Sequence, residues 1–338
     1  MSRDGDPTSA SKSESDPTGP DEIFVAKLVE PPEAVAEPLL RTHDLSLRYG
    51  SNQAVDKLSL TVNRGEIYGF LGRNGAGKTS TIRMIMGICR PDSGLIEFRG
   101  SKVRRIGKRE KHEIGYVSQE QFFYPWMTCE RIGSFVGGLY RTWDAGEFRR
   151  LLSVLDLPPK RRIAHLSGGM KVKLALALAL AHRPTILILD EPTAGLDPVA
   201  RREFLEIIRQ QAKEHARTTF FSSHLIGEVE RVADRVGIIH RGRLEFEGPL
   251  ELLREEVREV ALTQIEELSQ QNGEHALLEK ARATGLRFLR RGFGEVPTFL
   301  FHGSRDVWRV ATEAGITSTE LSLEDAFIGL ATEVVEKI

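Results

Sequence analysis

From about Leu39 onward, short apolar runs alternate with amphipathic stretches, an arrangement typical of a β-sheet covered by helices. Residues 66–71 (EIYGFL) and 185–189 (TILIL) are runs of strand length. The second is almost uninterrupted, which is typical of a parallel strand buried on both faces. A further strand is predicted at 218–222 (TTFFS), after a polar helix at about 201–216. These features predict an α/β fold.

A helix is predicted at 79–89, because its apolar side chains recur at helical spacing. Short strands and turns at 234–248 are expected to close this core. Beyond them, 249–268 is predicted to be helical and charged, and 285–338 mixes strand-like runs with a final amphipathic helix at about 322–331. We therefore expect residues 249–338 to form a small C-terminal accessory domain of α+β type.

Residues 1–38 contain six of the fifteen prolines and nine acidic residues against three basic ones. A segment with so few large apolar side chains cannot bury enough surface to offset its ordering entropy. We expect a disordered acidic tail, and a regulatory or docking arm is the alternative.

The overall charge does not suggest a nucleic-acid partner, because 47 Lys and Arg stand against 48 Asp and Glu. The two cysteines are too few for a disulfide framework, so a reducing compartment is expected. No apolar run approaches the roughly 20 residues of a membrane-spanning helix, and the first 22 residues contain no apolar stretch. These features lead us to expect a cytoplasmic protein that does not cross a membrane by itself.

The segment 72–79 (GRNGAGKT) matches the phosphate-binding pattern G-x-x-x-x-G-K-[ST] and lies between a predicted strand and a predicted helix. Its glycines allow consecutive N–H groups to converge on one anion. Lys78 would reach the β and γ phosphates, and the Thr79 hydroxyl would bind Mg²⁺. A glycine-rich turn without function is the alternative. The expected nucleotide contacts are Gly72, Arg73, Asn74, Gly75, Ala76, Gly77, Lys78, Thr79 and Ser80.

Two adjacent acids, Asp190 and Glu191, follow the run at 185–189. Successive side chains of a strand point to opposite sides, so the two carboxylates can serve two targets. Asp190 would hold Mg²⁺, directly or through water, and Glu191 would orient and deprotonate the attacking water. A solvated acidic turn is the alternative.

The segment 166–170 (LSGGM), which begins 24 residues before Asp190, resembles the LSGGQ signature of ATP-binding cassette (ABC) ATPases. Further motifs of that family follow the same order over about residues 40–250. They are Tyr49 ahead of the phosphate loop, Gln119 in YVSQE, Asp197 in PTAGLD and His224 in FFSSH, 33 residues past Glu191.

The resemblance implies a P-loop NTPase core with a mixed sheet, an antiparallel β subdomain and an α-helical subdomain at about 120–180, the whole ATPase domain spanning 39–248. It implies that Tyr49 stacks on adenine, that Gln119 binds Mg²⁺, and that His224 senses the γ-phosphate. For His224 and Gln119, the alternatives are a structural histidine and a surface amide.

In this family the signature serves the ATP of a partner subunit, so Ser167, Gly168, Gly169 and Asp197 are expected to contact ATP at a dimer interface. A Ser cap and bare glycine amides at a helix start suit an anion. Met170 replaces the usual Gln, with little loss expected because Ser167 and backbone N–H groups make the implied contacts. One ABC ATPase unit per chain implies a homodimer, or pairing with another such unit.

Four aromatic residues lie within 121–127 (QFFYPWM), just after Gln119. In transporters of the family, this region borders the groove that receives a helix of the membrane subunit. Such a patch suits helix docking, and filling of the helical subdomain's core is the alternative. The resemblance thus implies an ATPase that drives a separate integral membrane permease from the inner face of the membrane.

The segment 322–327 (SLEDAF) resembles the end of exporter ATPases that pair with ABC-2-type permeases. A soluble ABC ATPase acting on a nucleic-acid or ribosome complex is the other functional class considered. Such proteins usually carry two ATPase units or a long coiled-coil insertion, and neither is evident here. A regulatory, non-hydrolysing member is expected to lack Glu191 or His224, and both are present.

Overall fold

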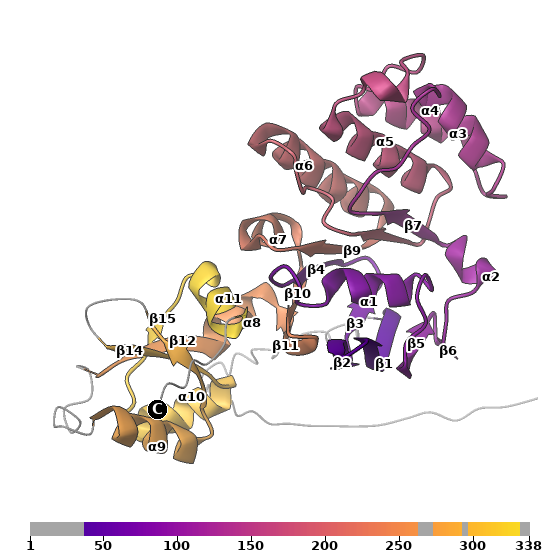
Figure 1. Ribbon diagram of the computed structural model, residues 1–338. Coiled ribbons are helices and arrows are strands. Elements are labelled where there is room, and N and C mark those ends of the chain that lie inside the picture. Colours follow the sequence, from indigo (N-terminus) through magenta and orange to yellow (C-terminus); the bar gives the residue numbers. More distant parts are fainter. Residues whose placement is uncertain (1–36, 263–272, 293–296, 332–338) are drawn as a thin grey trace, which may run out of the picture. The chain divides into compact units, whose positions relative to one another are not determined.

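A computed structural model describes residues 37–262, 273–292 and 297–331 of the chain (Figure 1). The predicted acidic tail lies outside these ranges except for its last two residues. Of these, Pro38 already begins strand β1, one residue before the predicted start of the ATPase domain at residue 39. Within the described ranges, no helix combines the length and the apolarity that crossing a membrane requires.

A six-stranded sheet forms the centre of the main α/β core, in the order β11-β10-β4-β9-β8-β7. All neighbouring pairs are parallel except β10 with β11. The strands are β4 (Ile67–Leu71), β7 (Ile114–Val117), β8 (Ile186–Leu189), β9 (Thr218–Ser223), β10 (Arg235–His240) and β11 (Arg243–Pro249). Every residue of β4, β8 and β9 is buried, which confirms that the run at 185–189 is a doubly covered parallel strand.

The two faces of this sheet bury alternate side chains in two separate cores. Ile186 and Ile188 of β8 join one core with helix α1 (Lys78–Ile85) and the antiparallel sheet, whereas Leu187 and Leu189 join the other. This division follows from the two-residue period of a strand. The second core contains α5 (Gly168–Ala181), α6 (Pro198–His215) and α7 (Ile226–Val232).

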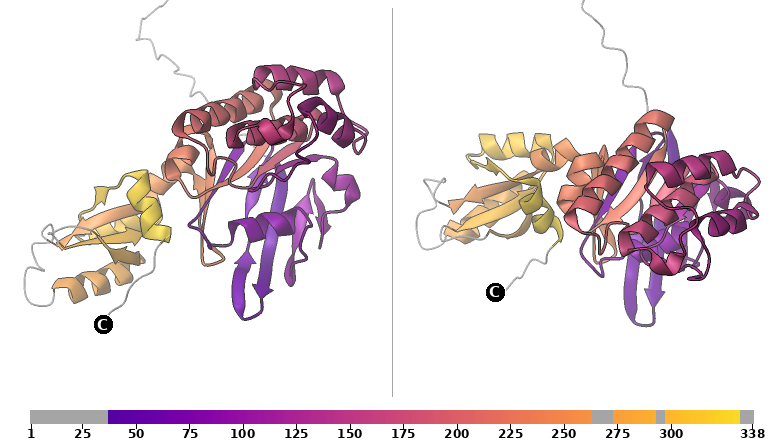
Figure 2. Two further views of the ribbon diagram at one scale, coloured as in Figure 1. Left: turned by 45° about the horizontal axis from the view of Figure 1, so that its top comes forward. Right: turned by 90° about the horizontal axis from the view of Figure 1, so that it is seen from above.

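The antiparallel sheet has the order β2-β1-β5-β6, with β3 also paired to β1. Its strands are β1 (Pro38–Tyr49), β2 (Asn52–Leu58), β3 (Thr61–Asn63), β5 (Ser93–Phe98) and β6 (Ser101–Val103), and α2 (Lys108–Lys111) leads from it to β7. The helical subdomain lies on the opposite side of the central sheet (Figures 1 and 2). It consists of α3 (Cys129–Gly137), α4 (Ala145–Val154), the short η1 (Ile163–His165) and α5.

The C-terminal part contains a four-stranded antiparallel sheet in the order β13-β14-β12-β15. Its elements are α8 (Leu250–Glu256), β12 (Val257–Ala261), α9 (Gly273–Thr284), β13 (Arg287–Arg291), β14 (Thr298–His302), α10 (Arg305–Glu313), β15 (Thr319–Glu320) and α11 (Leu323–Ala331). From β12 to β15 the succession is βαββαβ, which with this strand order is the ferredoxin-like arrangement.

The prediction of one helix over 249–268 is wrong for residues 257–261. Helix α8 ends at Glu256, and residues 257–261 form strand β12. Pairing of β12 with β14 on one side and β15 on the other outweighs the local helical preference of this charged stretch. The rest of the predicted helix, from residue 263, lies outside the described residues.

Helix α11 links the C-terminal sheet to the main α/β core. Phe299 and Phe301 of β14 face a core formed with α9 and α10, whereas Leu300 between them faces the core that also contains α11 and α7. The described residues accordingly form one compact unit. A boundary at residue 248 between ATPase and accessory domains stays a prediction.

Candidate active site

The loop between β4 and α1 brings backbone and side chains together around one cavity. Gly75 and Gly77 have φ angles of +83° and +113°, which favour glycine. A Cβ at Gly77 would lie 2.5 Å from the Ala54 carbonyl oxygen, and one at Gly72 would lie 2.6 Å from that of Ile239. The fold therefore requires glycine at positions 72 and 77 because of these close contacts, and favours it at position 75 because of the positive φ angle.

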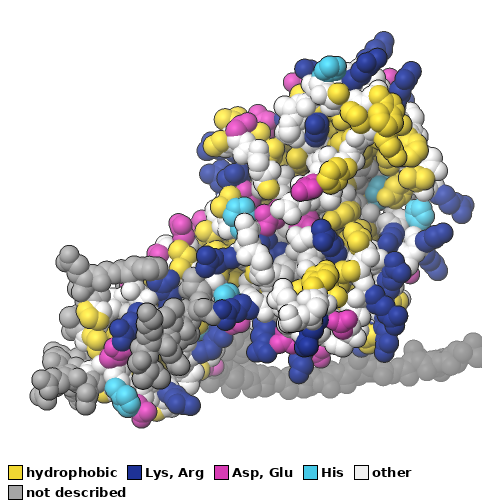
Figure 3. All heavy atoms as spheres, viewed as in Figure 1, with side chains coloured by type: hydrophobic (Ala, Val, Ile, Leu, Met, Phe, Trp, Pro, Cys, Tyr) yellow, Lys and Arg dark blue, Asp and Glu magenta, His cyan; other side chains and the backbone are white. Residues whose placement is uncertain are grey.

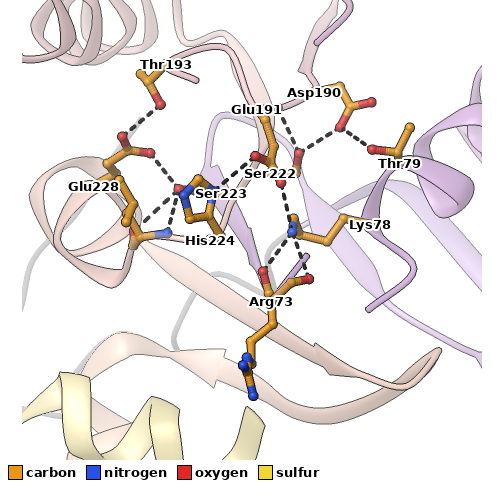
Figure 4. A network of polar contacts seen from close by, with 12 residues as sticks. Arg73, Lys78, Thr79, Asp190, Glu191, Thr193, Ser222, Ser223, His224 and Glu228 are labelled. Atoms are coloured by element: carbon orange, nitrogen blue, oxygen red, sulfur yellow. Dashed lines mark hydrogen bonds and ion pairs between the residues drawn. The ribbon is translucent and has the colours of Figure 1, made fainter. Parts of the chain in front are cut away.

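Lys78 is buried and its ammonium group has three partners. Nζ donates to the carbonyl oxygens of Gly72 at 2.7 Å and Arg73 at 3.2 Å, and it forms an ion pair with Glu191 Oε1 at 2.9 Å (Figure 4). Lys78 and Glu191 are only 4% and 7% exposed. An ammonium has three N–H donors, so an entering phosphate must displace one of these partners.

Asp190 lies directly after β8 with its carboxylate among hydroxyl groups. Oδ1 accepts hydrogen bonds from Thr79 Oγ1 at 3.1 Å and Ser222 Oγ at 3.0 Å. Burial nevertheless raises the pKa of Asp190, because desolvation disfavours the charged form. The hydrogen bonds from Ser222 and Thr79 and the charge of Arg83 offset this effect of burial only in part.

Glu191 is held between Lys78 and His224. Its Oε2 lies 3.0 Å from His224 Nδ1, and its backbone N–H donates to Ser222 Oγ at 3.0 Å. The φ angle of Glu191 is +44°, a left-handed conformation that a residue with a side chain rarely adopts. Such backbone strain is often found at active sites.

A cavity of about 310 Å³ lies beside the phosphate loop and Glu191. Tyr49, which is 50% exposed, and Gln119 line it together with Glu191. The phosphate loop contributes Asn74, Gly75, Gly77, Lys78, Thr79 and Ser80. The structure thus brings Tyr49, the phosphate loop, Gln119 and Glu191 together, although they span more than 140 positions of the sequence.

Asn52 and Ala54 also line this cavity, and sequence reasoning missed them. Both lie in β2, which pairs with the end of β1 that carries Tyr49. No motif marks them. Recognising this hairpin would have been the only available signal.

The remaining predicted residues do not line the cavity of their own chain. Ser167 caps α5, accepting from the Met170 N–H at 3.2 Å, and Asp197 caps α6, accepting from the N–H groups of Val199 and Ala200. These hydrogen bonds lower the pKa of Asp197. Ser167 and Gly168 are exposed.

Gly168 has no visible reason within the chain to be glycine. A Cβ built there would meet nothing within 4 Å, and the backbone does not have a positive φ angle. Among the described residues, no contact accounts for glycine at this exposed position.

This fold and cavity define a P-loop nucleotide-binding protein, and comparison with known proteins specifies its family. The ABC transporter family model matches residues 55–194. The bacitracin transport ATP-binding protein BcrA of Bacillus licheniformis is 40% identical over 245 residues, 72% of this chain and 79% of that protein. The linearmycin resistance ATP-binding protein LnrL of Bacillus subtilis is 36% identical over 211 residues, 61% of this chain and 68% of that protein.

A solved structure of an ATP-binding subunit of an ABC transporter is 30% identical and has a TM-score of 0.58, covering 64% of this chain and 92% of that one. The chain belongs to the ATP-binding subunits of ABC transporters. It is an ABC-type ATPase, as the signature and its companion motifs predicted. The alternative of a soluble ABC ATPase acting on nucleic acid or ribosomes finds no support among these relatives.

Proposed function

We propose that two copies of this chain close around two ATP molecules and thereby drive a separate membrane permease in export. Pairing with a different ABC ATPase unit would serve equally. The observation that carries the proposal is the Glu191 carboxylate held between Lys78 and His224 at the edge of the nucleotide cavity.

ATP binding would release the Glu191 carboxylate from Lys78 and leave it free to act as a base. The phosphates compete with the Glu191 carboxylate for Lys78, because both are anions and the three donors of Nζ are already engaged. Once released from Lys78, the carboxylate accepts a proton from water, and His224 at 3.0 Å holds that carboxylate and the water in place. Tyr49, half-exposed at the cavity, stacks on the adenine ring.

Thr79, Asp190 and Gln119 fit a bound Mg²⁺ ion. Their donors are hydroxyl, carboxylate and amide oxygens, which are the hard ligands that Mg²⁺ prefers. The Thr79 and Asp190 oxygens already lie 3.1 Å apart, and Gln119 lines the same cavity. When bound with ATP, Mg²⁺ neutralises charge on the β and γ phosphates.

The exposed start of α5 supports the dimer. Ser167 and Gly168 present a hydroxyl and bare N–H groups at a helix N-terminus, the end that favours anions. The open space around Gly168 fits close approach by a second nucleotide-bound chain. Ser167, Gly168, Gly169 and Asp197 would then contact the partner's ATP.

An exposed apolar patch suits the permease. The docking surface consists of five large side chains around α3, seen as hydrophobic atoms gathered there in Figure 3: Phe122, Tyr124, Trp126, Phe135 and Leu139. Phe122 is 86% and Trp126 is 63% exposed, whereas Phe123 and Met127 pack against the core. The two interpretations of 121–127 therefore apply to different residues of the same stretch.

The relatives suggest the direction of transport and the location. BcrA is named for bacitracin transport and LnrL for linearmycin resistance, both consistent with removal of a toxic compound. We place the chain in the cytoplasm, held at the inner face of the membrane by the permease.

The test is trapping of the ATP-bound dimer. Glu191→Gln should bind ATP, lose turnover and double in mass by light scattering. The control Lys78→Ala should bind ATP weakly and stay monomeric. A Glu191→Gln protein that remains monomeric at saturating ATP and Mg²⁺, alone and with its permease, would refute the proposal.

A further inference from the structure

Glu228, on α7, is a buried carboxylate that lies outside the nucleotide cavity. It is 4% exposed. It accepts hydrogen bonds from Thr193 Oγ1 at 2.7 Å and Ser223 Oγ at 2.5 Å (Figure 4). The Arg201 guanidinium lies 3.2 Å away. Burying a carboxylate is unfavourable unless donors and opposite charge compensate it. Here two hydroxyls and a guanidinium converge on it.

One of these hydroxyls fixes the segment that carries His224. Ser223 directly precedes His224 and donates to Glu228, while its oxygen accepts the N–H of Leu225 at 3.0 Å. The Ser223 hydroxyl therefore connects the residue before His224 with the backbone of the residue after it, and it binds Glu228 as well. Because β9 ends at Ser223, this anchor sets where the imidazole points as it leaves the sheet.

The other hydroxyl fixes the segment that carries Glu191. Thr193 lies two residues beyond Glu191, and the turn between them is closed by the Ala194 N–H donating to the Glu191 carbonyl at 3.1 Å. The positive φ of Glu191 is disfavoured for a residue with a side chain, so surrounding contacts must hold it. The Thr193–Glu228 hydrogen bond is one of these contacts.

We propose that Glu228 is a positioning residue for ATP hydrolysis, holding Glu191 and His224 at hydrogen-bonding distance through Thr193 and Ser223. Neither oxygen of Glu228 contacts the cavity that binds ATP. Its effect therefore falls on the rate of hydrolysis and not on ATP affinity. This inference rests on the roles proposed above for Glu191 and His224.

The first test replaces the carboxylate with an amide of the same shape. In Glu228→Gln only one oxygen accepts, and the charge that faces Arg201 is lost. We expect kcat for ATP hydrolysis to fall about tenfold, which is about 1.4 kcal/mol in activation free energy, with the ATP Kd changed less than about twofold. The matched control is Glu230→Gln, an exposed glutamate on the same helix that pairs with Arg254 at 3.0 Å; its kcat should equal that of the wild type.

A second set of variants acts at Thr193, in case Glu228→Gln folds poorly. Thr193→Val keeps the volume but removes the hydroxyl, and it should lower kcat, whereas Thr193→Ser restores the hydroxyl and should rescue it. Combining Thr193→Val with Glu228→Gln should lower kcat by less than the product of the two single effects, because both changes act on the same hydrogen-bond network.

Unchanged kcat in both Glu228→Gln and Thr193→Val would overturn the inference. Parallel loss of kcat, ATP affinity and thermal stability in both would also overturn it, since that is what a merely structural contact produces. Normal turnover in Glu191→Gln would instead refute the proposed catalytic site itself, so the two failures are distinguishable.

Discussion

Replacing Lys78 with methionine should destabilise the nucleotide-free protein as well as weaken ATP binding strongly. Methionine has nearly the length of lysine without its charge, so little space is left empty. The Glu191 carboxylate, 7% exposed, would lose its ion partner at 2.9 Å and keep only the His224 contact at 3.0 Å.

The magnitude follows from burial of the pair. Removing one partner of a buried ion pair costs about 3–5 kcal/mol, because the other charge stays buried and uncompensated. At about 2–4 °C per kcal/mol for a domain of this size, Tm should fall by about 6–20 °C. The carbonyl oxygens of Gly72 and Arg73 also lose their hydrogen bonds from Nζ. Because these losses add to that of the ion pair, we expect the decrease in Tm to be no smaller than the lower limit of this range.

The assay is thermal unfolding of four nucleotide-free proteins: wild type, Lys78→Met, Glu191→Gln and the double variant. Neutralising Glu191 in the Lys78→Met background should recover more than half of the lost Tm, since no buried charge is then unpaired. Saturating ATP should stabilise the wild type by about 2.7 kcal/mol at 100 times Kd and Lys78→Met not at all. A double variant no more stable than Lys78→Met would refute the reasoning.

Three further outcomes test other parts of the structure. Tyr49→Ala should weaken ATP binding by about 1–3 kcal/mol, the range for base stacking on an aromatic ring; an unchanged Kd by fluorescence titration would remove Tyr49 from the site. Phe122→Ala with Trp126→Ala should release the chain from solubilised permease in a pull-down while basal ATPase activity persists, whereas Phe123→Ala should lower Tm because this ring packs in the core. Burial lowers the pKa of His182 to about 4, so the unfolded chain takes up a proton first as the pH falls below about 6.5, and stability is lost between pH 6.5 and 4. At pH 5 the loss is about 2 kcal/mol relative to neutral pH, and His182→Phe should abolish this component in urea unfolding; the same pH dependence in both proteins would contradict the assignment.

The phosphate loop and the buried strands were predictable because their causes are local. Glycine is favoured where the backbone has a positive φ angle, as at Gly75 and Gly77, and the spacing of these glycines can be recognised in the sequence. The run at 185–189 predicted β8 because a strand covered on both faces needs apolar side chains at every position. Element types and the family signature follow from such short-range rules.

The roles of individual side chains were harder to predict where both faces of a segment are apolar. The sequence alone did not show which aromatic residues of 121–127 are exposed. In the structure Phe122 is exposed, whereas its neighbour Phe123 is partly buried against the core. Residues 257–261 look helical, and they form a strand because two other strands flank them. Neither outcome has a local cause.

Short-range chemistry along the chain thus established the α/β class, the glycine loop and the paired acids Asp190 and Glu191. The folded chain alone established which groups meet: Thr79 with Asp190 across 111 positions, and Thr193 with Glu228 across 35. The ferredoxin-like extension and the cavity-lining Asn52 and Ala54 belong to the same category. The physical reason is that a hydrogen bond or an ion pair depends on distance in space, and strand order, which sets that distance, is a property of the whole chain.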